Sequence, residues 1–201
     1  STGLHGQWRH AALDRLPGEG SRAVPQNIEL KVGSSAAQFA AIRDRLSQRT
    51  CCSCETLIQV DTYFRVPYGR LKLREIESTI GKTAELIQYD RPDRAGVRTS
   101  TYQRVDVNPE VKLALLAALG ELVTVRKRRT VAIWHSTRIH LDEVDGLGLF
   151  IELETVLDEG ERSTERGRAE YDDVVEWLDL ASLEPIPGSY SDLLIEKGQH
   201  A

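Results

Sequence analysis

Several segments of the sequence carry charged or polar side chains at every second position. Residues two apart lie on the same face of a β-strand, so in strands these side chains would line one face of a sheet. Six segments have this pattern: Asn27, Glu29 and Lys31; Arg70, Lys72 and Arg74; Tyr89 and Arg91; Lys127 and Arg129; Arg138, His140 and Asp142; and Glu152 and Glu154. The acids lie mainly in the first and last segments, and basic residues dominate the segments between them.

A single amphipathic strand is ordinarily explained by one face on the core and one face in water. Solvated faces usually mix charges because like neighbours repel, whereas Lys72 and Arg74, like Lys127 and Arg129, place positive charges together. Such rows indicate a bound anion with several negative charges. Arginine binds phosphate oxygens bidentately and lysine binds them as a point charge, while carboxylates suit Mg²⁺ or Mn²⁺. The pattern therefore predicts a metal–polyphosphate site.

The phosphates would be held by side chains, since the sequence has no glycine-rich loop of the Walker type. The elements that position these side chains follow from periodicity and from Gly and Pro turn signals. Strands are predicted at 27–32, 55–66, 70–77, 83–91, 97–107, 122–134, 138–144 and 149–157, and helices at 35–49, 111–119 and 164–180. Hairpin-connected strands in this number favour an α+β fold, a closed eight-stranded antiparallel β-barrel with flanking helices.

Composition narrows the class of protein. The 201 residues are 40% hydrophobic and 28% charged, as in a globular domain. The net charge of −5 argues against nucleic acid or an anionic membrane surface as partner. There is no apolar run of transmembrane length and no signal peptide, so a cytoplasmic location is expected. A homodimer is left open.

The expected domain covers residues 26–201. Residues 1–25, with Gly18, Gly20 and Pro25, read as an irregular leader or a remnant of processing, especially since the chain contains no Met. The three cysteines, Cys51, Cys52 and Cys54, lack a second pair at zinc-ligand spacing and are interpreted as reduced structural thiols.

In their order and spacing, these segments make the chain resemble the CYTH family, which includes class IV adenylyl cyclases and thiamine triphosphatases and is also called the triphosphate tunnel metalloenzymes. The resemblance spans roughly residues 26–195. It rests on segments 27–31 (NIELK), 69–75 (GRLKLRE), 87–91 (IQYDR), 125–129 (VRKRR), 140–148 (HLDEVDGLG), 150–154 (FIELE) and 189–194 (SYSDLL).

The resemblance implies a barrel whose lumen binds a triphosphate and divalent metal. It implies metal binding by Glu29, Glu152, Glu154 and Asp142, and phosphate binding by Lys31, Lys72, Arg74, Arg91, Lys127 and Arg129. The catalytic set would be Glu29, Lys31, Glu152 and Glu154. The family signature usually begins with Glu, where this chain has Asn27, which can offer a metal a carbonyl oxygen but no charge.

Three activities remain open at this point. The leading expectation is a Mg²⁺- or Mn²⁺-dependent phosphohydrolase acting on inorganic tripolyphosphate, thiamine triphosphate or a nucleoside triphosphate. Adenylyl cyclase activity, with cyclic AMP and pyrophosphate as products, would use nearly the same site. A module that binds polyphosphate or nucleotide without turnover is the third reading, and Asn27 is the residue that favours it.

Overall fold

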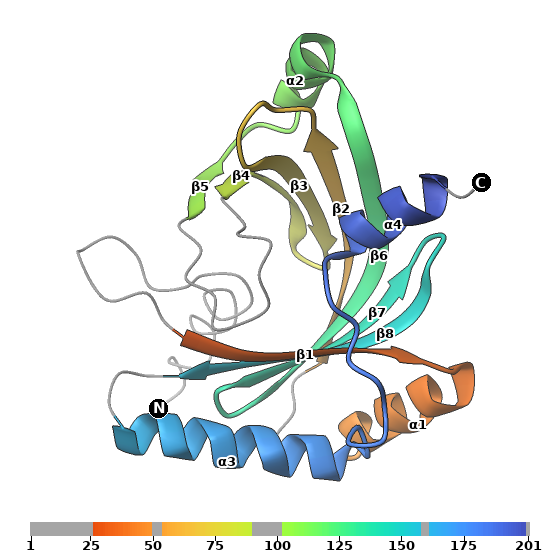
Figure 1. The fold of residues 1–201 in the computed structure, drawn as a ribbon, viewed down its shortest axis with the longest axis vertical. Helices are drawn as coiled ribbons and strands as arrows, with labels where there is room; N and C mark the ends of the chain where they lie inside the picture. Colours follow the sequence, from red (N-terminus) through yellow and green to blue (C-terminus); the bar gives the residue numbers. More distant parts are fainter. Residues whose placement is uncertain (1–25, 50–53, 90–101, 158–160, 200–201) are drawn as a thin grey trace.

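The computed structural model describes residues 26–49, 54–89, 102–157 and 161–199 (Figure 1). These residues form eight strands and four helices. In chain order they are β1 (Gln26–Ser34), α1 (Ala36–Ser47), β2 (Cys54–Phe64), β3 (Arg70–Ser78), β4 (Gly81–Tyr89), β5 (Tyr102–Asp106), α2 (Val111–Leu119), β6 (Glu121–Trp134), β7 (Thr137–Val144), β8 (Gly148–Leu157), α3 (Glu161–Trp177) and α4 (Tyr190–Gln199). The α+β class is confirmed.

All eight strands belong to one antiparallel sheet in the order β1-β8-β7-β6-β2-β3-β4-β5. The sheet curves, so that β1, β8 and β7 lie across from β2, β3 and β4 in Figure 1. Among the described residues no ladder joins the two edge strands, β1 and β5, and the predicted closure into a barrel is not found. One physical reason is visible at β1. Its free edge is occupied by another segment, because Ile186 N donates to Lys31 O at 2.7 Å and Val32 bridges to Pro185.

The apolar face of the sheet is its outer face, which packs against the helices. Ile139, Ile151 and Leu153 of the sheet are buried together with Ile42 of α1 and Val174 of α3. A fully buried Leu or Ile side chain stabilises a fold by about 1.5–3 kcal/mol, so this layer holds α1 and α3 on the sheet. Because strand side chains alternate between faces, the polar half must point to the opposite, inner face.

A second outer cluster holds α2 against the other end of the sheet. Phe64, Leu73 and Ala84 are buried there, and Leu115 and Leu119 of α2 pack on them. No described helix is long and apolar enough to cross a bilayer.

Helix α4 packs on the inner face, where Tyr190 is buried with Tyr63, Val125, Val144 and Phe150. The sequence patterns predict no helix after residue 180, so α4 was missed. Its start is fixed by reciprocal hydrogen bonds. Ser189 Oγ accepts from Asp192 N at 3.3 Å, and the Asp192 carboxylate accepts from Ser189 N at 2.9 Å. This is the capping-box pattern with Asp as the fourth residue.

Candidate functional site

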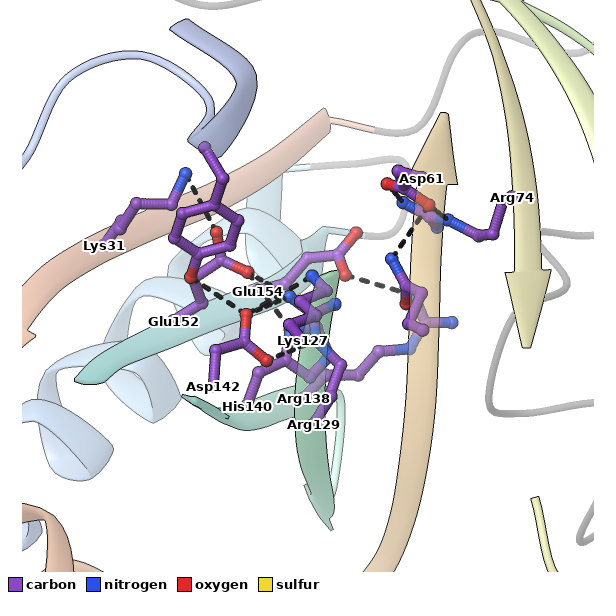
Figure 2. A network of polar contacts seen from close by, with 12 residues as sticks. Lys31, Asp61, Arg74, Lys127, Arg129, Arg138, His140, Asp142, Glu152 and Glu154 are labelled. Atoms are coloured by element: carbon purple, nitrogen blue, oxygen red, sulfur yellow. Dashed lines mark hydrogen bonds and ion pairs between the residues drawn. The ribbon is translucent and has the colours of Figure 1, made fainter. Parts of the chain in front are cut away.

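The inner face is defined by the side chains that alternate away from the helix-packed layer. It gathers a network of acidic and basic residues from β1, β2, β3, β6, β7 and β8, which point toward one another in Figure 2. The ladders place Lys31 opposite Glu152, Arg129 opposite Asp142, and Asp61 opposite Arg74. The period-two pattern therefore predicted correctly that these side chains, apart from Asp61, share a face.

The first group, here the Asp61 cluster, consists of Asp61, Lys72 and Arg74. Arg74 binds the Asp61 carboxylate with two parallel hydrogen bonds, Nε to Oδ1 at 2.8 Å and Nη2 to Oδ2 at 2.9 Å. Lys72 Nζ donates to Oδ2 at 2.9 Å, and Gln59 Nε2 donates to Oδ1 at 3.2 Å. Asp61 is buried, with 4% of its surface exposed. The sequence interpretation did not select Asp61 or Gln59.

The second group, the Asp142 cluster, consists of Asp142, Lys127 and Arg129. Arg129 again makes two parallel bonds, Nε to Oδ1 at 2.6 Å and Nη2 to Oδ2 at 2.5 Å, and Lys127 Nζ donates to Oδ2 at 3.3 Å. Tyr190 of α4 also donates its hydroxyl to Oδ2, at 2.9 Å. Both carboxylate oxygens of Asp142 therefore accept from neighbouring donors.

Beside the Asp142 cluster lies a row of three carboxylates on β1 and β8, Glu29, Glu152 and Glu154. This row is called the carboxylate edge. Glu152 pairs with Lys31 at 3.0 Å and with Arg129 at 2.5 Å. Glu154 accepts from Asn27 Nδ2 at 3.0 Å and from Arg138 Nη1 at 3.3 Å. Glu29 is exposed and stands opposite Glu154 in the β1–β8 ladder.

Helix α4 covers part of this network. The Tyr190 ring lies 4.4 Å from Lys31 Nζ and 5.0 Å from Lys127 Nζ, distances suited to cation–π contacts. Arg70, an inner-face residue of β3, donates to Asp192 at 2.6 Å and so fixes the start of α4. The chemistry-bearing face is accordingly bounded on one side by the C-terminal helix.

Neighbouring cations favour the ionised forms of Asp61 and Asp142. Burial alone would raise the pKa of Asp61, but Arg74 and Lys72 outweigh it and hold that pKa well below its ordinary value. Burial would also raise the pKa of Asp142, but Arg129 and Lys127 outweigh it and lower this pKa to about 2. For His140, burial and then Arg129 lower the pKa, which favours the neutral imidazole, and its Nδ1 lies 3.6 Å from Glu152 Oε2.

Burial and neighbouring Arg129 lower the pKa of Lys127 to about 8. The rows of like charge favour a bound anion, and the structure adds a counter-charge from the chain itself. Asp61 and Asp142 each lie between two of the cations and neutralise part of their charge.

Most of the predicted site residues lie on the inner face (Figure 2). Lys31, Lys127, Arg129, Asp142 and Glu152 form one connected network. Lys72 and Arg74 join Asp61, Glu154 lies beside Asn27 and Arg138, and Glu29 is at the rim. Arg91 lies outside the described residues, as do Cys51, Cys52 and residues 1–25.

The oxygen donors of the carboxylate edge suit a hard divalent cation. Asn27 Oδ1 is buried and accepts no hydrogen bond from the residues that the structure describes, although its amide nitrogen donates to Glu154. The donor chemistry of Asn27, Glu29, Glu152 and Glu154 therefore fits Mg²⁺ or Mn²⁺. In the part of the chain that the structure describes, no three acidic, His or Cys side chains are already arranged around a common metal position.

Comparison with protein families gives one match over most of the chain: the CYTH domain profile matches residues 25–179. None of the curated proteins compared with the sequence matches it.

Solved structures share the fold. The PH1819 protein from Pyrococcus horikoshii OT3 is 24% identical with a TM-score of 0.66, and the match covers 85% of this chain and 99% of that one. A proposed adenylate cyclase from Vibrio parahaemolyticus is 18% identical with a TM-score of 0.61, covering 84% and 97%. A second proposed adenylate cyclase, from Bacillus halodurans, is 19% identical with a TM-score of 0.52, covering 81% and 93%. At these identities the likeness concerns the fold.

Proposed function

The chain belongs to the CYTH domain family, and from this membership and its charged inner face we propose that it is a metal-dependent enzyme acting on a triphosphate. The observation that carries the proposal is the arrangement of the two Lys–Arg pairs. They lie on β3 and β6, on either side of β2, next to a separate edge of carboxylates. The two Lys–Arg pairs that would bind phosphate oxygens therefore lie on different strands from the carboxylates that would bind metal ions.

The phosphate-binding residues of the proposal are Lys31, Lys72, Arg74, Lys127 and Arg129, with Arg91 kept from the family resemblance. The side chains of Lys72 and Arg74 are 10% and 18% exposed, and those of Lys31 and Arg129 are 15% and 11% exposed. They are shielded from bulk water. Such partly desolvated cations stabilise charge that develops on a phosphoryl group.

Glu29, Glu152 and Glu154 would hold Mg²⁺ or Mn²⁺, with Asn27 Oδ1 as a neutral donor. When bound, the ion would supply neutralisation of phosphate charge and activation of a nucleophile. Asp142 was predicted as a metal ligand, but it is omitted from the proposed set because its side chain is fully buried and also accepts from the Tyr190 hydroxyl, whereas the Glu152 side chain is 21% exposed. Binding would exchange partners: cations paired with Glu152 and Glu154 would turn to phosphate oxygens.

Hydrolysis is the proposed reaction, with water attacking the terminal phosphorus. It needs only the phosphate and metal groups of the inner face. Formation of cyclic AMP from ATP is the second candidate, and the two structural neighbours proposed to be adenylate cyclases favour it. That reaction needs, in addition, a pocket for the base and a ribose 3′-hydroxyl placed at the α-phosphorus.

Binding without turnover is the alternative from another class. The observation in its favour is that the acids on the inner face are engaged with cations of the same face. Closure of the sheet around the ligand also belongs to the proposal, and it would require residues 185–186 to leave the edge of β1.

Product analysis distinguishes these activities. The protein is incubated with tripolyphosphate, thiamine triphosphate or ATP, each with Mg²⁺ or Mn²⁺, and the products are resolved by ion-exchange chromatography. Release of orthophosphate supports hydrolysis, and cyclic AMP with pyrophosphate supports cyclisation. Binding of tripolyphosphate without any product would support a module that binds the ligand without turnover.

A further inference from the structure

Asp61 is a buried carboxylate that the proposed chemistry leaves without a role. It lies on β2, between the Lys–Arg pair of β3 and Lys127 of β6, and it accepts hydrogen bonds from Lys72, Arg74 and Gln59. We propose that Asp61 is a positioning residue: it holds Lys72 and Arg74 in the arrangement that receives the phosphates of the substrate. This inference rests on the proposed function and adds a residue to the same site.

The first support is the geometry of Arg74. Two parallel bonds of 2.8 and 2.9 Å to one carboxylate fix the plane of the guanidinium, and bidentate pairing is the arrangement with the greatest directional specificity. An arginine left without such a partner would sample several rotamers and would lose that freedom when a ligand binds. Asp61 therefore removes an entropic cost from phosphate binding by Arg74.

The second support is the charge state of Lys72. Burial and then Arg74 lower the pKa of this lysine, while Asp61 acts in the opposite direction. A lysine buried beside an arginine, without the carboxylate, loses its proton more readily and then binds phosphate poorly. Asp61 therefore favours the charged form of Lys72 in a shielded place.

The third support is that the same arrangement occurs twice. Asp142 holds Arg129 through two parallel bonds and receives Lys127 on one of the same oxygens. In each cluster the Lys and Arg lie two residues apart on one strand, and the Asp lies on the neighbouring strand. Two independent pairs of strands thus present a Lys–Arg pair in the same way, which a single chance contact would not produce.

Two other roles for Asp61 make different predictions. If Asp61 competes with the ligand for the two cations, its removal should tighten the binding of tripolyphosphate, since the cluster gains positive charge. If Asp61 serves stability alone, its removal should lower the free energy of unfolding while the folded protein keeps its affinity.

The experiment compares wild type, Asp61→Asn, Arg74→Ala and the double variant. Glu75→Gln is the matched control, because Glu75 pairs with Lys112 at 2.5 Å and follows Arg74 on β3, so it points to the opposite face. Affinity for inorganic tripolyphosphate is measured by calorimetry, at a temperature where urea titration shows that every variant is folded. Where turnover is found, kcat and KM are measured with the same substrate.

Asp61→Asn is expected to weaken tripolyphosphate binding by about tenfold, the scale of one charge-assisted hydrogen bond. Glu75→Gln should stay within about twofold of wild type, the scale of a surface ion pair. Because Asp61 acts through its cations, adding Asp61→Asn to Arg74→Ala should cost clearly less than it costs in wild type.

Unchanged or tighter binding by folded Asp61→Asn would overturn the inference, and so would full additivity with Arg74→Ala. Wild-type binding without turnover would overturn the proposed enzyme and leave the inference to be decided by the binding data. Failure of wild type to bind tripolyphosphate would overturn both.

Discussion

Glu154 is the residue on which the proposed metal chemistry depends most. It receives hydrogen bonds from Asn27 and Arg138 and faces Glu29 across the β1–β8 ladder. Its side chain is 24% exposed, so a hydrated ion can reach it. Glu152, by contrast, is bound to both Lys31 and Arg129.

Replacement of Glu154 by Gln should abolish metal-dependent turnover while the fold is retained. The amide keeps the size of the side chain and one acceptor oxygen, but it replaces the other oxygen by a donor and removes the charge that a divalent ion requires. Phosphate release is measured over a range of Mg²⁺ concentrations, and far-ultraviolet circular dichroism checks folding. Wild-type activity at limiting Mg²⁺ would show that Glu154 does not contact the metal.

Asn27→Glu tests the departure from the family signature. A carboxylate at position 27, beside Glu154, adds a full negative charge in surroundings where screening is weaker than in water. The concentration of Mg²⁺ or Mn²⁺ that gives half-maximal activity should therefore fall. If neither this concentration nor the products change, residue 27 is not part of the metal site.

Lys127 predicts a pH dependence of anion binding. Its pKa is lowered to about 8, and an anion prefers the protonated amine. The contribution of Lys127 is therefore complete well below pH 8 and is lost as the pH rises through this value. Between pH 7 and 9 the affinity for tripolyphosphate should fall by about tenfold relative to Lys127→Arg, which stays charged. Calorimetry at both pH values measures the ratio, and parallel profiles for the two proteins would contradict the assignment.

At the scale of elements, helix α3 and strand β8 approach closely at Gly167. A Cβ atom at this position would overlap Leu157 Cδ2, and Leu157 is itself buried. The contact matters for the site because β8 carries Glu152 and Glu154 on its other face. The packing of α3 thus supports the carboxylate edge from behind.

Gly167→Ala should destabilise the protein by about 1 kcal/mol or more, since overpacking of a filled contact outweighs the gain in helix propensity. Gly198→Ala in α4 is the control, because no atom of the described residues lies within 4 Å of its added Cβ, and it should be neutral or slightly stabilising. Urea denaturation of both variants measures the difference. Equal stability of the two variants would show that Leu157 moves aside without cost.

At the scale of the whole molecule, alternation predicted the strands and most of the inner face because an antiparallel sheet separates its two faces residue by residue. Asp61 was missed because β2 shows no run of alternating charges; Leu57, Gln59 and Tyr63 share its face. Helix α4 was missed although Ser189 and Asp192 have the spacing of a capping box. Closure could not be read from the strand pattern, because it depends on which segment reaches the edge of β1.

The central claim is that the inner face binds a triphosphate through its two Lys–Arg pairs. Calorimetric titration of tripolyphosphate at fixed ionic strength tests it, with Lys72→Gln/Lys127→Gln compared against Arg43→Gln/Arg168→Gln, two exposed outer residues whose loss gives the same net charge. Wild type and the outer variant should bind alike, and the inner variant should bind at least about a hundredfold more weakly, as expected for two charge-assisted hydrogen bonds. Equal affinity of the two double variants, or no binding by wild type at millimolar ligand, would contradict the claim.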